Sequence, residues 1–433
     1  MTLKGHLQFT ITIKHMRSDI ICSLDIGSSS IRTLIAKLPD LRSRGKGLYL
    51  NGNEEIVEVS SVPTKGFSKG VVSNLALLSD AVEESVSKAE RSAHCRVRSL
   101  ITGISGVHIR TFKSRGSVHI SDRPSEITQG DIKRCIESAK LIAMSLDREA
   151  VHLIAERFYI DDKMEIDDPL GLFGSKLDVD LNIITSLVSI LQNLIKAVNL
   201  AGYEVEDVVI SGAGTALAVF DRKEMEEGSV IIDVGKDLTE LALFNNGKFR
   251  DSFYFPFGSD DLTAVLQDKL KIMFNEAEDL RIKYCIIKRE NHELYEDGPI
   301  RLSGAGEEGG IISRREISNL LFPKVEEIMQ DIYKKVEPFL RDRKKLPRIC
   351  VIGGISKMDG FVEAVEDIFC VPVDMGTIRN MKDLHDTSFA TCLGLVRYGI
   401  NKQLEKKSVP ISDTDTFIGR AVSKARALLS EYF

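Results

Sequence analysis

The chain contains 433 residues, which is enough for two to four domains, and its 43% hydrophobic and 28% charged residues are typical of a globular protein. The formal net charge of -6 offers no broad basic field, so nucleic acid is not expected as a partner. The seven cysteines lack close spacing and are expected to be free thiols in a reducing cytosol, mostly buried. The N-terminus lacks the apolar core of a secretion signal, and no uncharged run reaches the ~20 residues of a membrane-spanning helix.

The first distinctive stretch is SLDIGSSSIRTLIAKL, in which an apolar strand ends in Asp25, passes through Gly27 and three serines, and returns to strand. A carboxylate repels phosphate, so Asp25 is better suited to hold a Mg²⁺ ion through water beside a phosphate group. The alternative is a strand that simply ends in a turn. The residues whose amides and hydroxyls can contact phosphate oxygens are Ser28, Ser29 and Ser30.

Between this hairpin and the middle of the chain, residues 98–179 are predicted to form a β-rich insert with one helix capped by Thr128. A helix is predicted over residues 182–202, ending at a glycine, and a buried strand over 205–214. Strands alternate with helices in both halves of the chain, which indicates an α/β protein.

The first pattern returns in SVIIDVGKDLTELALFNNGKF, where an apolar strand ends in Asp233 and Gly235. Asn246 and Gly247 predict a tight hairpin after the next strand. Two related domains that each offer a hairpin to a shared cleft would explain the repetition. Asp233 would then face the same hydrated Mg²⁺ from the opposite side.

A third turn lies in RICVIGGISKMDGFVEAVEDIF, where a strand runs into Gly353 and Gly354 and a helix begins near Gly360. Glycines let a backbone approach a flat or phosphorylated ligand, and helix N-termini favour anionic oxygens. Two matched hairpins and this turn favour a nucleotide cleft over three unrelated turns. The segment GAGEEG at 304–309 is interpreted as a loop, and the absence of a Walker A sequence excludes a P-loop NTPase.

The last residues, TFIGRAVSKARALLSEYF, predict an amphipathic helix after a polar linker. Its apolar face and basic flanks suit a helix that lies in an anionic membrane interface, and the alternative is a helix docked on the protein's own core. The residues expected to contact the membrane are Phe417, Ile418, Arg420, Val422, Lys424, Arg426, Leu428, Leu429 and Phe433.

The order hairpin, hairpin, glycine turn resembles the actin, sugar-kinase and heat-shock-chaperone superfamily. Within it, the chain is similar to the bacterial cell-division protein FtsA family over roughly residues 20–400. The phosphate motifs correspond to LDIGSSSIRTLIA and IDVGKDLTELALF, and the adenosine motif corresponds to VIGGISKMDGFVEAVEDIF. The most specific likeness is to the family's inserted 1C subdomain, in ITGISGVHIRTFKSRGSVHIS and DIKRCIESAK.

This resemblance implies an actin-like fold of two related domains around a nucleotide cleft that binds ATP and Mg²⁺. It places Gly353 and Gly354 at the adenosine, and Glu278 and Arg281 beside the ribose or base. It also implies a filament-forming protein that tethers FtsZ to the cytoplasmic face of the cell membrane at the division site, together with other division proteins. The implied parts are an N-terminal extension at 1–18, subdomain 1A at 19–97, 180–217 and 378–400, 1C at 98–179, 2A at 218–248 and 319–377, 2B at 249–318, a linker at 401–415 and a membrane-targeting helix at 416–433.

The second phosphate motif departs from the family pattern. Lys236 and Asp237 stand where glycines are usual, and Asp237 would bring negative charge close to a phosphate, which Lys236 could offset. Arg281 replaces a usual lysine and keeps its charge. We therefore expect ATP binding rather than turnover, with at most weak ATPase activity. The alternatives are a small-molecule kinase of the same superfamily and an actin-like adaptor for pili or another membrane machine.

Overall fold

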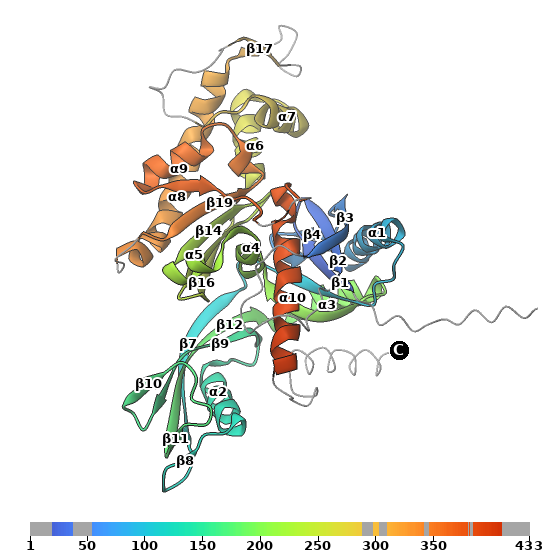
Figure 1. The fold of residues 1–433 in the computed structure, drawn as a ribbon. Helices are drawn as coiled ribbons and strands as arrows, with labels where there is room; N and C mark the ends of the chain where they lie inside the picture. Colours follow the sequence, from blue (N-terminus) through green and yellow to red (C-terminus); the bar gives the residue numbers. More distant parts are fainter. Residues whose placement is uncertain are drawn as a thin grey trace, which may run out of the picture.

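The structure is a computed structural model that describes residues 20–37, 54–287, 298–302, 310–341, 346–379, 381 and 384–408. The predicted N-terminal extension, the GAGEEG loop and the amphipathic tail lie outside these residues. The described chain forms two lobes, each built on a five-stranded sheet, and an insert with a sheet of its own (Figure 1).

The first lobe contains the first predicted hairpin. Its sheet has the strand order β13-β6-β1-β2-β3, in which β1 pairs antiparallel with β2 and parallel with β6. The strands are β1 (Ile20–Ile26), β2 (Ser30–Lys37), β3 (Glu55–Pro63), β6 (Ser99–Ile104) and β13 (Glu204–Ile210). The helices of this lobe are α1 (Leu75–Ala93), α3 (Val188–Leu200), α4 (Ser211–Val219) and α10 (Ala390–Ser408).

Helices α1 and α10 cover opposite faces of this sheet. The Thr33 and Ser85 hydroxyls share a hydrogen bond of 2.8 Å, so Thr33 faces α1. The Ser23 hydroxyl donates to the Cys392 carbonyl oxygen of α10 at 2.8 Å. Ser23 pairs across the strands with Leu34, the neighbour of Thr33, and neighbouring side chains on a strand point to opposite faces. The hairpin therefore emerges from a sheet that is buried on both sides.

The second lobe repeats this plan. Its sheet has the order β16-β15-β14-β19-β20, with β14 antiparallel to β15 and parallel to β19, and it has a separate hydrophobic core. The strands are β14 (Ser229–Val234), β15 (Thr239–Asn245), β16 (Lys248–Phe255), β19 (Arg348–Gly353) and β20 (Val373–Met375). The helices are α5 (Arg222–Glu227), α6 (Ser259–Leu270), α7 (Phe274–Tyr284), α8 (Arg314–Arg341) and α9 (Phe361–Phe369), and β17 (Ile300–Arg301) pairs with β18 (Ile311–Ile312). The predicted pair of related domains is confirmed.

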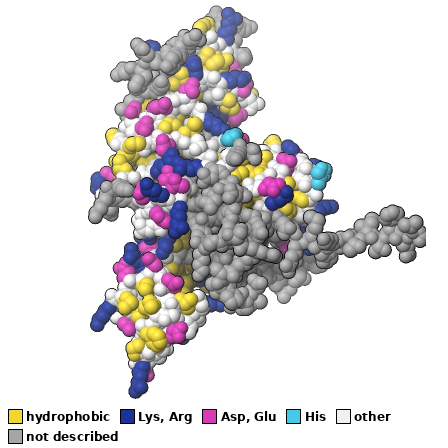
Figure 2. All heavy atoms as spheres, in the orientation of Figure 1, with side chains coloured by type: hydrophobic (Ala, Val, Ile, Leu, Met, Phe, Trp, Pro, Cys, Tyr) yellow, Lys and Arg dark blue, Asp and Glu magenta, His cyan; other side chains and the backbone are white. Residues whose placement is uncertain are grey.

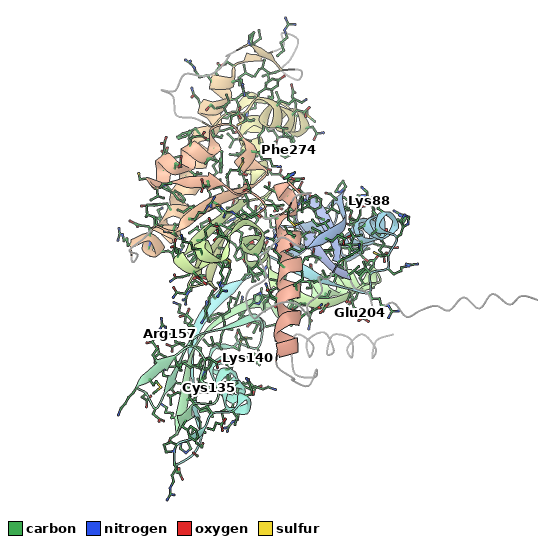
Figure 3. All side chains as sticks on the ribbon, viewed as in Figure 1. Lys88, Cys135, Lys140, Arg157, Glu204 and Phe274 are labelled. Atoms are coloured by element: carbon green, nitrogen blue, oxygen red, sulfur yellow. The ribbon has the colours of Figure 1, made fainter. Side chains whose placement is uncertain are left out.

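The insert is a four-stranded antiparallel sheet in the order β10-β9-β12-β7, with α2 packed on one face. Its buried Cys135 thiol, labelled on α2 in Figure 3, donates to backbone carbonyl oxygens of two strands. The predicted Thr128 cap is confirmed, because its hydroxyl and Asp131 form a capping box. The elements are β7 (Arg110–His119), β8 (Ser125–Glu126), α2 (Gln129–Ala143), β9 (Arg148–Ile160), β10 (Met164–Ile166), β11 (Phe173–Gly174) and β12 (Lys176–Leu187).

Three boundaries differ from the sequence interpretation. The strand predicted over residues 205–214 ends at Ile210, because α4 begins at Ser211. The helix predicted from residue 182 begins only at Val188, because residues 182–187 extend β12 and pair with β9, and residues 182–185 also pair with β7. The linker predicted from residue 401 begins as helix, because α10 continues to Ser408. Asn401 is buried and Lys402 forms an ion pair with the buried Asp207, so packing on the first lobe continues beyond the predicted end of the domain.

Helices α4 and α10 cross at the centre of the molecule, between the two sheets (Figure 1). A Cβ atom at Gly394 would lie 1.7 Å from the Gly214 carbonyl oxygen, so only glycine permits this approach. The crossing places the N-termini of both helices at the boundary between the lobes. Among the described residues, no helix is long and apolar enough to cross a membrane.

Charged side chains of both signs are interspersed over the visible faces of the second lobe and the insert (Figure 2). All seven cysteines are free: five are buried, Cys95 is half-buried and Cys370 is exposed. This agrees with the predicted free and mostly buried thiols.

Candidate functional site

A cavity of about 340 Å³ lies between the lobes, where both predicted hairpins and the glycine turn meet. Its size is within the range of ligand-binding cavities. Its walls combine acidic, basic and hydroxyl side chains with glycine backbone. The lining residues are Asp25, Ile26, Gly27, Ser28, Ser29, Arg32, Phe67, Gly70, Ser105, Ser211, Asp233, Gly235, Lys236, Asp237, Leu238, Glu240, Ser259, Ile352, Gly353, Gly354, Lys357, Thr387, Ser388 and Thr391.

The first hairpin contributes the turn between β1 and β2. The Gly27 amide donates to the Ser30 carbonyl oxygen at 3.1 Å, which holds the turn tight while Ser28 and Ser29 face the cavity. Ser30 itself does not line the cavity, and its buried hydroxyl has no partner among the described residues. The turn can thus offer the amides and hydroxyls of two of the three predicted serines.

The glycine turn forms the wall beside the second hairpin. Gly353 has a φ of +94°, and a Cβ atom there would lie 2.2 Å from the Val234 carbonyl oxygen and 2.8 Å from Asp233 Oδ1. Only glycine fits this close approach of β19 to the end of β14. Nothing lies within 4 Å of the position of a Gly354 Cβ, so this residue leaves open space for a ligand.

Three carboxyl groups dominate the electrostatics of the cavity. Burial raises the pKa of Asp25, which its ion pair with Arg32 at 3.8 Å partly offsets. Burial and the charge of Asp25 raise the pKa of Asp233 to about 6. Burial and the charge of Asp233 raise the pKa of Glu240 to about 8. The buried carboxyl groups therefore oppose one another's ionisation, and a bound cation would relieve this repulsion.

The residues fit a magnesium ion held through water better than one held directly. Among the described residues, no group of three acidic, histidine or cysteine side chains is placed to ligate a metal by itself. Asp25 and Asp233 nevertheless face the same cavity from opposite lobes and raise the negative potential there. Mg²⁺ usually keeps several waters and uses one or two carboxylates together with phosphate oxygens.

Several lining residues were not predicted as site residues from the sequence. Arg32 lies opposite Asp25 in the strand register and could have been inferred from the hairpin alone. Glu240 lies opposite Asp233 in the register of the second hairpin and could have been inferred in the same way. Leu238 lies within the second phosphate motif, and Ile352 and Lys357 lie within the adenosine motif. The remaining side chains come from distant elements with no local motif, namely Phe67, Ser105, Ser211, Ser259, Thr387, Ser388 and Thr391.

Glu278 and Arg281 are not among the residues that line this cavity. They lie on α7, which begins at Phe274 in the second lobe (labelled in Figure 3). The Arg281 guanidinium is buried, donates to the Thr263 hydroxyl of α6 at 2.9 Å and lies 3.7 Å from the Glu278 carboxylate. In this structure the pair joins α6 to α7, and its contact with a nucleotide stays a prediction. The predicted membrane-contacting residues 417–433 lie outside the described residues.

Solved structures with this arrangement define the class of the fold. One protein from a PilM-PilN type IV pilus biogenesis complex aligns with a TM-score of 0.61 at 15% identity, covering 88% of this chain and 98% of that one. MreB5 of Spiroplasma citri bound to AMPPNP aligns with a TM-score of 0.50 at 13% identity, covering 90% and 98%. The chain has an actin-like fold, with two lobes around a cleft, and this confirms the predicted fold class.

Sequence comparison identifies the family within this class. The model of the SHS2 domain inserted in FtsA matches residues 106–185, and the model of cell division protein FtsA matches residues 230–394. FtsA of Pseudomonas aeruginosa is 29% identical over 91% of this chain and 92% of its own length. FtsA of Borreliella burgdorferi is 28% identical over 96% and 100%, respectively. The chain belongs to the FtsA family of cell-division proteins.

Proposed function

We propose that the cleft binds ATP together with Mg²⁺. The observation that carries the proposal is the meeting of two Asp-x-Gly hairpins and a glycine turn around one cavity. The amides and hydroxyls of Ser28 and Ser29, which follow the tight turn at Gly27, would hold phosphate oxygens, and the open backbone at Gly354 would face the adenosine. A Mg²⁺ ion in the site would neutralise part of the phosphate charge.

Asp25 and Asp233 would orient the waters of that ion and Lys236 would face the phosphates. Lys236 is also 3.8 Å from Asp260, so its charge is shared between the cavity and α6. Asp237 places a further acidic side chain on the cavity wall, beside the expected phosphate position. We therefore propose nucleotide binding as the main role of the site, with at most weak ATPase activity.

We further propose that the protein polymerises on the cytoplasmic face of the cell membrane at the division site and tethers FtsZ filaments there, with other division proteins. Membership in the FtsA family supports this role. The amphipathic pattern of residues 416–433 supports membrane contact, since its apolar face and basic flanks suit an anionic interface. A single such helix binds weakly, and a filament would present many at once.

The test is liposome co-sedimentation of the full chain and of a chain ending at residue 416, with and without Mg-ATP. We expect pelleting on anionic vesicles that requires the tail and increases with Mg-ATP, and little pelleting on neutral vesicles. A full-length variant with Arg420, Lys424 and Arg426 changed to glutamate should lose the preference for anionic lipid. If the full chain stays in the supernatant under all conditions, the membrane role is wrong.

The pilus adaptor remains the second candidate because of the likeness to a chain from a PilM-PilN complex. A pulldown with purified FtsZ separates the two. Retention of FtsZ supports the cell-division role, and failure to retain it favours the pilus adaptor.

A further inference from the structure

A tight turn in the first lobe reaches the cavity next to the first phosphate hairpin. It joins β4 (Phe67–Ser68) to β5 (Val71–Val72) through Lys69 and Gly70. Both linking residues have left-handed backbone, with φ of 51° and 77°. Backbone amides exposed at such turns form concave sites that bind anions.

The turn is held in place from behind. Gly70 packs so closely on the segment that follows β6 that a Cβ atom would lie 2.2 Å from the Ser105 carbonyl oxygen. At the base of the hairpin, the Gly66 carbonyl oxygen accepts hydrogen bonds from the amides of Ser73 and Asn74 at 2.9 and 3.1 Å. These contacts are all within the first lobe, so the donors of the turn do not depend on the second lobe for their position.

A carboxylate from the second lobe occupies this turn. Asp237 Oδ2 accepts hydrogen bonds from the Ser68 hydroxyl and the Lys69 amide, both at 2.9 Å. The same amide lies 3.3 Å from the Ser28 hydroxyl of the first phosphate hairpin. One negatively charged oxygen atom is therefore held by a hydroxyl and an amide, directly beside a residue expected to contact phosphate.

We infer that Asp237 occupies a binding position for a nucleotide phosphate oxygen and competes with the phosphate for it. This inference rests on the proposed binding of nucleotide in the cleft. The Ser68 hydroxyl and the Lys69 amide each have one hydrogen atom to donate. A phosphate oxygen and a carboxylate oxygen that approach the same two donors also repel each other. The phosphate therefore has to displace Asp237, which also breaks a bond between the two lobes.

Two consequences distinguish this role from a purely structural contact between the two lobes. Removing the charge of Asp237 strengthens the binding of phosphate-rich nucleotides and leaves the binding of nucleoside monophosphate nearly unchanged. The Ser68 hydroxyl, once released from Asp237, becomes a phosphate ligand.

The experiment measures dissociation constants of Mg-ATP, Mg-ADP and AMP by calorimetry with the full chain. The variants are Asp237→Gly, which restores the residue usual in the family, and the near-isosteric Asp237→Asn. Asp268→Asn is the matched control, since Asp268 lies on α6 of the same lobe, pairs with Lys271 and is exposed. We expect both Asp237 variants to bind Mg-ATP about tenfold more tightly, with AMP and the control within about twofold of the wild type.

A double-mutant cycle tests the turn itself. In the Asp237→Gly background, Ser68→Ala should weaken Mg-ATP binding several-fold, and in the wild type it should not weaken it. Circular dichroism and thermal melting establish that each variant is folded, and Asp237→Asn keeps the side-chain volume if Asp237→Gly fails to fold.

The outcomes separate this inference from the proposed function. If the wild type binds Mg-ATP and neither Asp237 variant binds it more tightly, the competition is wrong and nucleotide binding stands. If the Asp237 variants tighten AMP binding as much as Mg-ATP binding, the turn does not bind phosphate. The same conclusion follows if Ser68→Ala leaves Mg-ATP binding unchanged in the Asp237→Gly background. If no variant binds any nucleotide, the proposed function and this inference both fail.

Discussion

Replacing Glu240 with glutamine should stabilise the protein at neutral pH, although the side chain forms hydrogen bonds in a buried site. Glu240 Oε1 accepts hydrogen bonds from the Gly212 amide at 2.9 Å and from the Tyr254 hydroxyl at 3.1 Å. A glutamine carbonyl oxygen can accept both bonds, and its amide group takes the place of the other carboxyl oxygen. The substitution therefore mimics the protonated acid and keeps these contacts.

The magnitude follows from the raised pKa of Glu240, about 8 in the folded protein against an ordinary value of 4.5. The folded state holds this proton more tightly than the unfolded state does. Its contribution to stability is therefore complete below pH 4.5 and is lost as the pH rises toward 8. When the pH rises from 5 to 7.5, the ionisation of Glu240 should lower the free energy of unfolding of the wild type by about 3 kcal/mol. Glu240→Gln should not show this loss.

The assay is urea unfolding of both proteins at pH 5 and pH 7.5 without added magnesium or nucleotide. Glu363→Gln on α9 is the control, because this carboxylate is exposed and its replacement should have the same small effect at both pH values. The reasoning is refuted if the difference in unfolding free energy between Glu240→Gln and the wild type is the same at both pH values. It is also refuted if the variant is the less stable protein at pH 7.5.

Two further substitutions test the centre of the molecule. Gly394→Ala should force α4 and α10 apart and destabilise the protein by about 3 kcal/mol or more, because its Cβ would lie 1.7 Å from the Gly214 carbonyl oxygen. The control is Gly298→Ala, since nothing lies within 4 Å of a Cβ at that position. Equal midpoints of urea unfolding for the two variants would contradict this prediction. Arg397→Met should destabilise the protein by about 3–5 kcal/mol, because it leaves the buried Glu54 carboxylate without the Arg397 Nε donor that lies 2.7 Å away. Adding Glu54→Leu to Arg397→Met should recover much of this free energy in the same assay, and a double variant no more stable than Arg397→Met alone would contradict the explanation.

Local sequence was sufficient to predict the three turns that define the cleft. The Asp-x-Gly patterns correspond to the antiparallel pairs β1–β2 and β14–β15, and the glycine turn at the end of β19 has a positive φ at Gly353. Outside the cleft, Asn246-Gly247 joins β15 to β16 with positive φ at both residues. Turns of this kind depend on a few adjacent residues, so a single sequence carries the information. The family resemblance also depended on these motifs and on the insert.

Local sequence was a poor guide where helix and strand patterns overlap. Residues 182–187 are apolar enough to begin the helix that follows, and their pairing with β7 and β9 makes them strand instead. The hydrogen bond from Arg281 to Thr263 of α6 is likewise not evident from local sequence, because it joins two helices. A contact of Arg281 with a nucleotide stays a prediction.

By itself, the sequence determined the duplicated lobes, the insert and the acidic hairpins, because each depends on short-range periodicity and turn chemistry. The class of protein followed from the resemblance of its motifs to a known family. Only the tertiary structure decided which groups share the cleft. Ser211 and Thr391 reach it because α4 and α10 cross at two glycines, and Asp237 reaches the Lys69 amide across the boundary between the lobes. Such contacts join residues far apart in the chain, and their geometry depends on how whole sheets and helices pack.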